Sequence, residues 1–287
     1  SSKENNKYAA IIASLPETLP KHMRNKCLKS GVVPLQGLKE ALYAIHCSIL
    51  TGQAWSKFNI LKVFKLNNKT QTSKKTYSEY QSKKILNNYG IKIPKSILSN
   101  PKQAVVDSKK IGFPVVIKIN SNKIIHKTEI KGVFININSE TEVKNSLKHL
   151  SKLGKDILIE KMIQDQIAEM IIGIKIDDQF GPIIIVGSGG IYTELINDSI
   201  TLLLPLKKSM VLKAIKNLKI ITLLKGYRDK PKGDIEAIVS TIMKLGIFAE
   251  KNASRLIEAE INPLIVRAKG KGVIAADALI HYLEDIK

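Results

Sequence analysis

Three oxygen-bearing side chains lie in two apolar stretches near the carboxyl end of the sequence. Glu260 and Asn262 are two residues apart, so in a strand their side chains point to the same face. Asp277 lies in the next apolar stretch, within 275–278. If the two strands pair, three hard oxygen donors converge, and such donors suit Mg²⁺ that bridges nucleotide phosphates. Because carboxylates in apolar strands are rarely buried without a partner, we expect a metal site rather than edge-exposed carboxylates.

Lys118 and His126 are the residues that could handle phosphate groups. Lys118 lies near the end of the apolar run 113–119, and a buried ammonium is unfavourable by several kcal/mol unless an anion meets it. A nucleotide phosphate would supply that anion, although the spacing alone favours a strand-end lysine that reaches water. His126 follows eight residues later, among lysines. A neutral imidazole can accept a phosphoryl group as phosphohistidine; a solvated loop histidine is the alternative.

A glycine-rich segment, residues 187–190, follows an apolar strand. Gly189 and Gly190 would let the backbone approach a phosphate closely and present N–H groups to it. The segment has neither a Walker lysine nor a GxGxxG pattern, so a tight turn explains the glycines equally well.

The composition indicates a folded protein that neither spans a membrane nor is secreted. Of 287 residues, 44% are hydrophobic and 25% are charged, which is enough apolar content for a core. No apolar run approaches the about 18 residues that span a bilayer, and the first residues form no signal pattern. Cys27 and Cys47 cannot form a disulfide framework, so we expect reduced thiols in a cytoplasmic protein.

The formal net charge of +21 does not by itself indicate a nucleic-acid-binding protein. Only four of the 46 basic residues are arginine, the residue that reads bases and clamps phosphates with a planar fork. The lysines are scattered over almost every segment, without an RNA-binding or helix-turn-helix signature. We therefore expect solvated surfaces that attract polyanions such as nucleotides and acyl-CoA. Specific nucleic-acid binding is not favoured.

The elements that must position these residues fall into three segments. Residues 1–55 contain two helices and are too few to bury an independent core. We therefore interpret them as the tail of a domain whose beginning lies elsewhere. Residues 56–76 are polar and aperiodic, as in a linker. Residues 77–287 mix helices and strands without regular βαβ repeats, which predicts an α+β layered domain. The expected helices are 21–29, 38–50, 79–89, 101–111 and one capped by Asp234; the expected strands are 113–119, 133–138, two within 157–176, 182–186, 257–266 and 273–280.

Seven short motifs occur in the order of a known family. They are YSEY (77–80), IGFPVVIK (111–118), HKTEIKGV (126–133), DQFGP (178–182), GSGGI (187–191), LLKGYR (223–228) and EINPL (260–264). With these motifs, residues 77–287 resemble the ATP-grasp domain of NDP-forming acyl-CoA synthetases, the ADP-forming acetate–CoA ligase group related to succinyl-CoA synthetase. Residues 15–37 are similar to the end of the CoA-ligase portion that precedes this domain in fused enzymes.

The resemblance implies a two-lobed ATP-grasp fold preceded by a small α/β tail of a CoA-ligase-like domain. It implies a ligase that forms carbon–sulfur bonds, in which acyl-CoA, ADP and phosphate are coupled to acid, CoA and ATP through an acyl phosphate and phosphohistidine. ATP or ADP and Mg²⁺ are the implied cofactors. The implied site residues are His126 for catalysis; Lys118, Glu160 at the adenine hinge, Met162, Gly189 and Gly190 for the nucleotide; and Glu260, Asn262 and Asp277 for the metal.

The sequence departs from the family pattern at two positions. Lys131 replaces the first glycine of a pair whose second member is Gly132, and we expect it to stiffen the loop. Glu260 stands where many relatives have aspartate, although succinyl-CoA synthetases have glutamate there. The CoA-binding domain and the acyl site are not within these residues. We therefore expect a fragment or subunit that needs a CoA-binding partner, with CoA and a small carboxylic acid as its substrates.

Two other functions stay open at this point. A non-catalytic ATP-grasp module of the kind fused to protein acetyltransferases would bind nucleotide without phosphorylation of His126. Nucleic-acid binding through the lysine excess would depend on salt and be independent of ATP.

Overall fold

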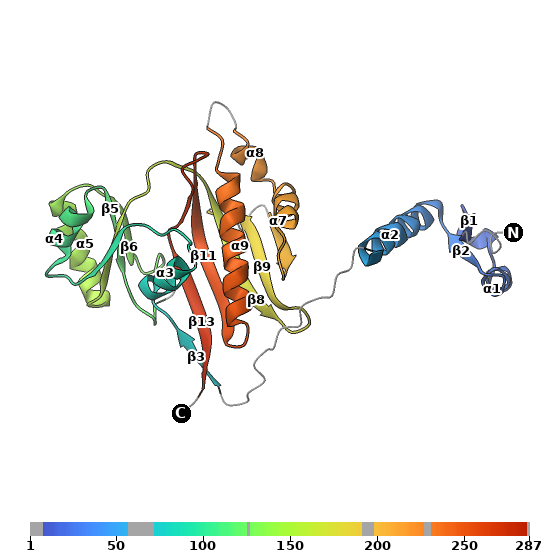
Figure 1. The fold of residues 1–287 in the computed structure, drawn as a ribbon, viewed down its shortest axis with the longest axis horizontal. Helices are drawn as coiled ribbons and strands as arrows, with labels where there is room; N and C mark the ends of the chain where they lie inside the picture. The colour runs from blue at the N-terminus through green and yellow to red at the C-terminus, as the bar shows by residue number, and fades with distance from the viewer. Residues whose placement is uncertain (1–7, 57–71, 125–126, 191–197, 227–230, 286–287) are drawn as a thin grey trace. The chain divides into compact units, whose positions relative to one another are not determined.

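The computed structural model describes residues 8–56, 72–124, 127–190, 198–226 and 231–285. The chain divides into two compact units, Ser1–Leu61 and Lys62–Lys287, whose elements are drawn in Figure 1. Within the described ranges, none of the helices has both the length and the apolar character that crossing a bilayer requires.

The first unit contains a parallel pair of strands joined by a helix. Strand β1 (Ala9–Ala13) pairs with β2 (Val32–Gln36), and α1 (Lys21–Lys29) lies between them in the sequence. Helix α2 (Leu38–Ser56) follows and continues six residues beyond the expected end at residue 50. A strand, a helix and a parallel strand form a βαβ unit, which normally belongs to a larger parallel sheet.

The second unit is built on two antiparallel sheets. In the described residues, the larger sheet has the strand order β10-β9-β8-β11-β13-β3, with β12 paired to β11, and the smaller has the order β4-β7-β5-β6. The larger sheet comprises β3 (Thr72–Thr76), β8 (Gln166–Asp177), β9 (Gly181–Ser188), β10 (Ser199–Leu203), β11 (Leu256–Arg267), β12 (Val273–Ala275) and β13 (Ala278–Asp285). The smaller comprises β4 (Ser96–Ser99), β5 (Val115–Ile119), β6 (Val133–Ile137) and β7 (Ile157–Lys161).

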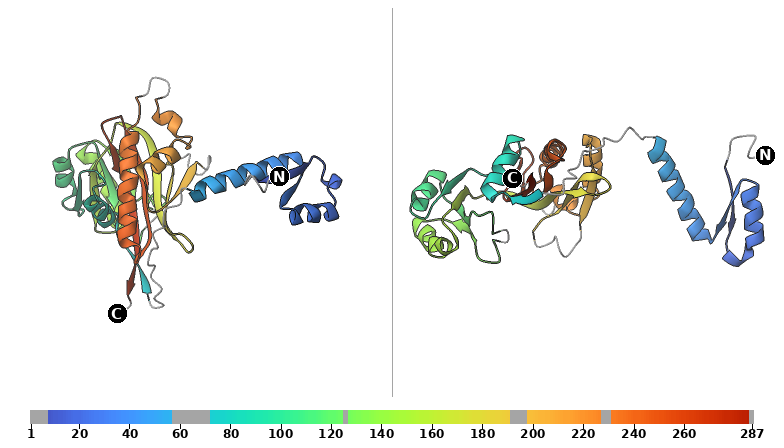
Figure 2. Two further views of the ribbon diagram at one scale, coloured as in Figure 1. Left: turned by 45° about the vertical axis from the view of Figure 1, so that its right-hand side comes forward. Right: turned by 90° about the horizontal axis from the view of Figure 1, so that it is seen from below.

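Each sheet is packed against its own helices, which gives the unit two hydrophobic cores (Figures 1 and 2). The larger sheet packs on α7 (Lys208–Ile215), α8 (Ile221–Leu224) and α9 (Ile235–Asn252), and the smaller on α4 (Ala104–Ile111) and α5 (Glu140–Leu153). Helix α3 (Glu79–Asn88) contacts β13. Helices packed on antiparallel sheets define the predicted α+β class.

Alternation along the strands decides which side chains enter the core. On β11, Ala259 and Ile261 are buried in the core of the larger sheet. Glu258 and Glu260 therefore project from the opposite face of that strand. The sequence-based prediction that Glu260 and Asn262 share one face depends on this alternation.

Helix starts follow the expected capping chemistry. The Ser78 hydroxyl accepts a hydrogen bond from the N–H of Gln81, and the Gln81 side chain accepts one from the N–H of Ser78, so the predicted capping box at α3 is confirmed. Asp234 caps α9 by accepting from the N–H of Ala237.

Besides the longer α2, three boundaries in the second unit differ clearly from the sequence-based expectation. Residues 72–76, expected in the linker, form edge strand β3 because they pair with β13; residues 57–71 lie outside the described residues. Helix α4 begins at Ala104 rather than 101, after a turn in which Asn100 accepts from the N–H groups that follow it. The expected strand 273–280 is split into β12 and β13, with Asp277 in the break.

Candidate functional site

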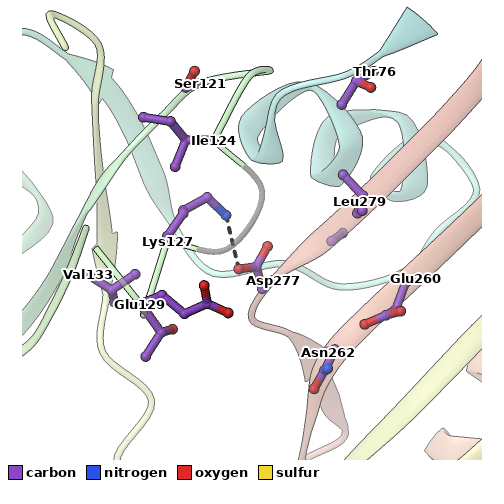
Figure 3. A pocket seen from close by; sticks show the side chains of 12 residues that line it. Thr76, Ser121, Ile124, Lys127, Glu129, Val133, Glu260, Asn262, Asp277 and Leu279 are labelled. Atoms are coloured by element: carbon purple, nitrogen blue, oxygen red, sulfur yellow. Dashed lines mark hydrogen bonds and ion pairs between the residues drawn. The ribbon is translucent and has the colours of Figure 1, made fainter. Parts of the chain in front are cut away.

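A cleft lies between the two sheets of the second unit. One part encloses about 740 Å³ and is lined from both sides, for example by Lys118 of the smaller sheet and Asn262 of the larger. An adjoining part encloses about 320 Å³; it shares Asn262 and Asp277 with the first and is also lined by Lys127 and Glu260. Figure 3 shows the side chains of this adjoining part, which we call the charged end of the cleft.

The three predicted metal ligands come together at the charged end. Glu260 and Asn262 project from β11, and both line the cleft. The N–H of Asn262 donates a hydrogen bond to the carbonyl of Asp277 (3.2 Å), which sets the two residues opposite each other. The N–H of Ala276 donates to the carbonyl of Pro263 (3.0 Å), and these two bonds hold the break between β12 and β13 beside the site.

Lys118 is buried, and its ammonium is neutralised by carboxylates of the chain itself. Its Nζ lies 2.6 Å from Oε1 of Glu79 and 3.0 Å from Oε2 of Glu160, and it donates to the carbonyl of Ala276 at 2.9 Å. The expectation of a lysine that reaches water is wrong, because only 8% of this side chain is exposed. The anion that meets it in the structure is a pair of glutamates, so a phosphate would join or replace these partners.

Two more lysines complete this buried network. Lys83 Nζ lies 2.7 Å from Glu79 and 2.5 Å from Glu160, and it also donates to the carbonyl of Ala276. Lys127 Nζ lies 2.6 Å from Oε2 of Glu79 and 3.2 Å from Oδ2 of Asp277. Three ammonium groups therefore face three carboxylates, and the network is neutral when all six are ionised.

The network shifts the protonation equilibria of its members. Burial by itself would raise the pKa of Glu79, but the ammonium groups of Lys118, Lys83 and Lys127 outweigh it and hold that pKa well below its usual value. Burial would lower the pKa of Lys118, but Glu79 and Glu160 raise it. Burial and the nearby charge of Glu79 raise the pKa of Asp277. Glu79 and Asp277 likewise raise the pKa of Lys127, so Lys118 and Lys127 are charged at neutral pH.

The donor set at the charged end fits a magnesium ion that is shared with phosphates. Among the described residues, no three His, Cys, Asp or Glu side chains are placed to hold a metal by themselves. Magnesium is usually bound through one or two carboxylates together with water and substrate phosphates. Glu260 and Asp277, with the amide oxygen of Asn262, match that pattern and not an all-protein cage.

The larger part of the cleft contains the predicted hinge and is lined by both apolar and polar side chains. Met162 and Glu160 both line it. The N–H of Met162 donates to the carbonyl of Pro114 (3.1 Å), and the Lys161 ammonium donates to the carbonyls of Gly112 and Phe113. These bonds fix the strand that leads into the hinge.

The predicted glycines are not brought to this cleft. Neither Gly189 nor Gly190 is among the described residues that line it. The N–H of Gly189 donates to the carbonyl of Glu169 at 2.8 Å, and a Cβ on Gly189 would lie 2.9 Å from the backbone of β8. Close packing of two strand backbones is thus a sufficient reason for glycine at position 189.

The predicted catalytic residue, His126, lies outside the described residues. Its described neighbours Ile124 and Lys127 both line the charged end. Lys131, which departs from the family pattern, has a backbone φ of 52°, a left-handed conformation that favours glycine. Gly132 has no room for a side chain, because a Cβ there would lie 2.8 Å from Ile119.

Glu79 and Lys83 are central to the site but are not among the residues predicted from the sequence. They are spaced i, i+4 in α3, in line with the buried Leu86 at i+7. Two opposite charges on the apolar stripe of a helix are the signal that could have identified them.

Residues 68–281 match the sequence pattern of the ATP-grasp domain family, so the chain belongs to this family. The resemblance and the two-lobed fold inferred from the sequence are therefore confirmed.

Relatives within this family are acyl-CoA ligases. Acetate–CoA ligase [ADP-forming] II of Archaeoglobus fulgidus is 36% identical over 205 residues, with 70% of this chain and 30% of the relative covered. The 4-hydroxybutyrate–CoA ligase [ADP-forming] of Nitrosopumilus maritimus is 31% identical over 274 residues, with 88% of this chain and 39% of the relative covered. The chain thus spans about a third of the length of these relatives.

A solved structure has the same fold. It is the dinucleotide forming acetyl-coenzyme A synthetase 1 of Ca. Korarchaeum cryptofilum in complex with coenzyme A and Mg-AMPPCP, with a TM-score of 0.63 and 34% identity. The match covers 71% of this chain and 92% of that one. Its phosphohistidine segment is described as pointing towards the nucleotide binding site.

Proposed function

We propose that the second unit binds ATP or ADP with Mg²⁺ and performs the phosphoryl-transfer step of an NDP-forming acyl-CoA synthetase. The observation that carries this proposal is the lining of the cleft, in which apolar side chains beside the predicted hinge adjoin a cluster of lysines and carboxylates. A nucleotide needs both kinds of surface, apolar contacts for its flat base and charged groups for its phosphates. The apolar side chains of the larger part include Val116, Ile135, Met162, Ile163, Pro263 and Ile265.

The residues that line the cleft have separable roles in this proposal. Lys118 and Lys127 supply positive charge to phosphate oxygens. Glu260, Asn262 and Asp277 would hold the magnesium ion, which when bound neutralises charge on the phosphates. Met162 and the backbone next to Glu160 would flank the base. Glu160 itself would act through its side chain, by fixing Lys83 and Lys118.

His126 is proposed to store the phosphoryl group between two transfers. The acyl phosphate made from acyl-CoA and phosphate gives its phosphoryl group to an imidazole, releasing the acid, and the phosphohistidine then passes it to ADP. We expect γ-labelled ATP to label the full chain in the reverse direction, and His126→Asn to abolish the label. The label is measured after base quench, because phosphohistidine is acid-labile.

The matched control for this test is His149→Asn, because His149 is a half-buried histidine on α5 whose ring nitrogen lies 3.0 Å from the Ile130 carbonyl. Its replacement is expected to leave labelling unchanged. A wild-type chain that binds nucleotide but takes up no label would contradict the relay. That result would favour the non-catalytic module of the kind fused to protein acetyltransferases.

We propose that the first unit is the tail of a CoA-ligase-like domain and meets a CoA-binding domain or subunit that also brings the acid. Parallel sheets are normally covered on both faces, and two strands alone are marginal. Within the described part of α2, Ala41 is the residue that is buried. Several large apolar side chains of this helix are exposed: Leu38, Leu42, Tyr43, Ile49, Leu50 and Trp55.

Trp55 reports on this proposed contact because it is the single tryptophan of the sequence. Its side chain is 75% exposed, so we expect its fluorescence to be readily quenched by acrylamide. Adding a CoA-binding subunit is expected to shift the emission to shorter wavelength and to reduce the quenching. A subunit that binds the chain while leaving emission and quenching unchanged would contradict coverage of α2.

A further inference from the structure

The side chain of Lys127 is paired with Asp277, one of the proposed metal ligands. Its ammonium contacts Oδ2 of Asp277 at 3.2 Å, as the dashed line in Figure 3 shows, and Oε2 of Glu79 at 2.6 Å. Only 9% of the Lys127 side chain is exposed, against 30% of Asp277. Asp277 thus already has a cationic partner, supplied by the chain.

A lysine and a divalent cation cannot share this carboxylate without a strong repulsion. The repulsion of a unit charge by a divalent ion is twice that between two unit charges, and it is little screened in a buried site. Phosphate oxygens are the groups that can relieve it, because they attract both cations. Metal without phosphate must therefore displace Lys127 from Asp277.

The backbone turn that begins at Lys127 is held in place by hydrogen bonds, so the change falls on its side chain. The carbonyl of Lys127 accepts from the N–H of Gly132 at 2.6 Å, and the N–H of Lys131 donates to the carbonyl of Thr128 at 3.1 Å. The N–H of Ile119 donates to the carbonyl of Gly132 (2.9 Å), which ties this turn to β5. A long lysine side chain can change partner by rotation about its own bonds.

We propose that Lys127 is a placeholder cation, which occupies Asp277 until magnesium arrives with a nucleotide and then turns to the phosphate oxygens. This inference rests on the proposed function. Lys127 is in this account a positioning residue that makes the binding of metal and the binding of nucleotide depend on each other. Metal alone binds weakly because it must displace the Lys127 ammonium from Asp277. Nucleotide strengthens metal binding because its phosphate oxygens then pair with this ammonium.

The test measures Mn²⁺ binding to the full chain without nucleotide, from the electron paramagnetic resonance signal of free Mn²⁺. We expect Lys127→Met to bind Mn²⁺ about tenfold or more tightly than wild type. Lys127→Arg, which keeps the charge, is expected to behave as wild type. The control Lys271→Met removes an exposed lysine that pairs with Asp165, and should leave Mn²⁺ affinity unchanged. Equal Mn²⁺ affinities of wild type and Lys127→Met would overturn the proposal.

Two further measurements separate this inference from the proposed function. Wild-type chain is expected to bind Mn²⁺ alone with a dissociation constant of about a millimolar or weaker, and a micromolar site without nucleotide overturns the placeholder even if Lys127→Met does not fold. Mg-AMPPCP is then titrated into wild type. If wild type binds Mg-AMPPCP but Lys127→Met has the Mn²⁺ affinity of wild type, only the placeholder role of Lys127 is overturned. If wild type does not bind Mg-AMPPCP, both the proposed function and the placeholder role are overturned.

Discussion

Replacing Glu79 with glutamine is expected to lower the free energy of unfolding by about 3–5 kcal/mol, the range for breaking a buried ion pair by removing one partner. Glu79 is the carboxylate that contacts all three lysines of the network, at 2.6–2.7 Å, and 1% of its side chain is exposed. The variant leaves three buried ammonium groups with two carboxylates. Urea-induced unfolding followed by circular dichroism of the full chain measures the change.

The matched control is Glu284→Gln, which removes a surface ion pair with Lys75 in which the glutamate is 53% exposed. Exposed pairs of this kind contribute about 0–1 kcal/mol, so this variant should unfold close to wild type. Similar losses for the two variants would contradict the role given to the buried network.

The difference between wild type and Glu79→Gln should also depend on pH in a defined direction. The folded pKa of Glu79 is held below its unfolded value, so its stabilising contribution is complete above the usual pKa of a glutamate. It is lost as the pH falls from that value through the lower folded pKa. The two proteins should therefore differ by a constant amount near neutral pH and approach each other in acid.

Replacing Asp277 with asparagine is expected to weaken binding of Mg-AMPPCP about 100-fold or more, since removal of one charged partner in a buried site costs this much or more in affinity. Asp277 is placed at the charged end by the break between β12 and β13, next to Asn262. The fold should persist, because Lys127 keeps its contact with Glu79. Calorimetric titration of the folded variant gives the affinity.

Asp178→Asn is the matched control for this change, because Asp178 is exposed in the turn between β8 and β9. It should bind Mg-AMPPCP as wild type does. An Asp277→Asn variant with wild-type affinity would remove Asp277 from the metal site.

Local chemistry made much of the fold predictable. The capping box of Ser78 and Gln81 depends on four consecutive residues, and the shared face of Glu260 and Asn262 depends on the period of a strand. Pairing of the neighbouring segments brings Asp277 beside Asn262 as predicted, although Asp277 lies in the break between β12 and β13 and not in a strand. These signals act over short distances along the chain, and a sequence displays them directly.

The buried network could not be predicted in the same way, because its partners are far apart in the sequence. Lys83 meets Glu160, 77 positions away, only after α3 packs on β13 and its charged side chains reach β5 and β7. The sequence suggests that Lys118 could pair with an anion that is not part of the chain, such as a phosphate. In the folded chain, Glu79 and Glu160 neutralise it. The break at Asp277 arises from bonds to Asn262 and Pro263, which a single apolar stretch does not reveal.

Calorimetric titration of the full wild-type chain with AMPPCP, with and without Mg²⁺, tests the central claim that one cleft in the second unit holds a nucleotide together with a magnesium ion. We expect saturable binding of one nucleotide per chain when Mg²⁺ is present, and binding at least about tenfold weaker without it. Absence of binding, or an affinity that does not change when Mg²⁺ is removed, would contradict it.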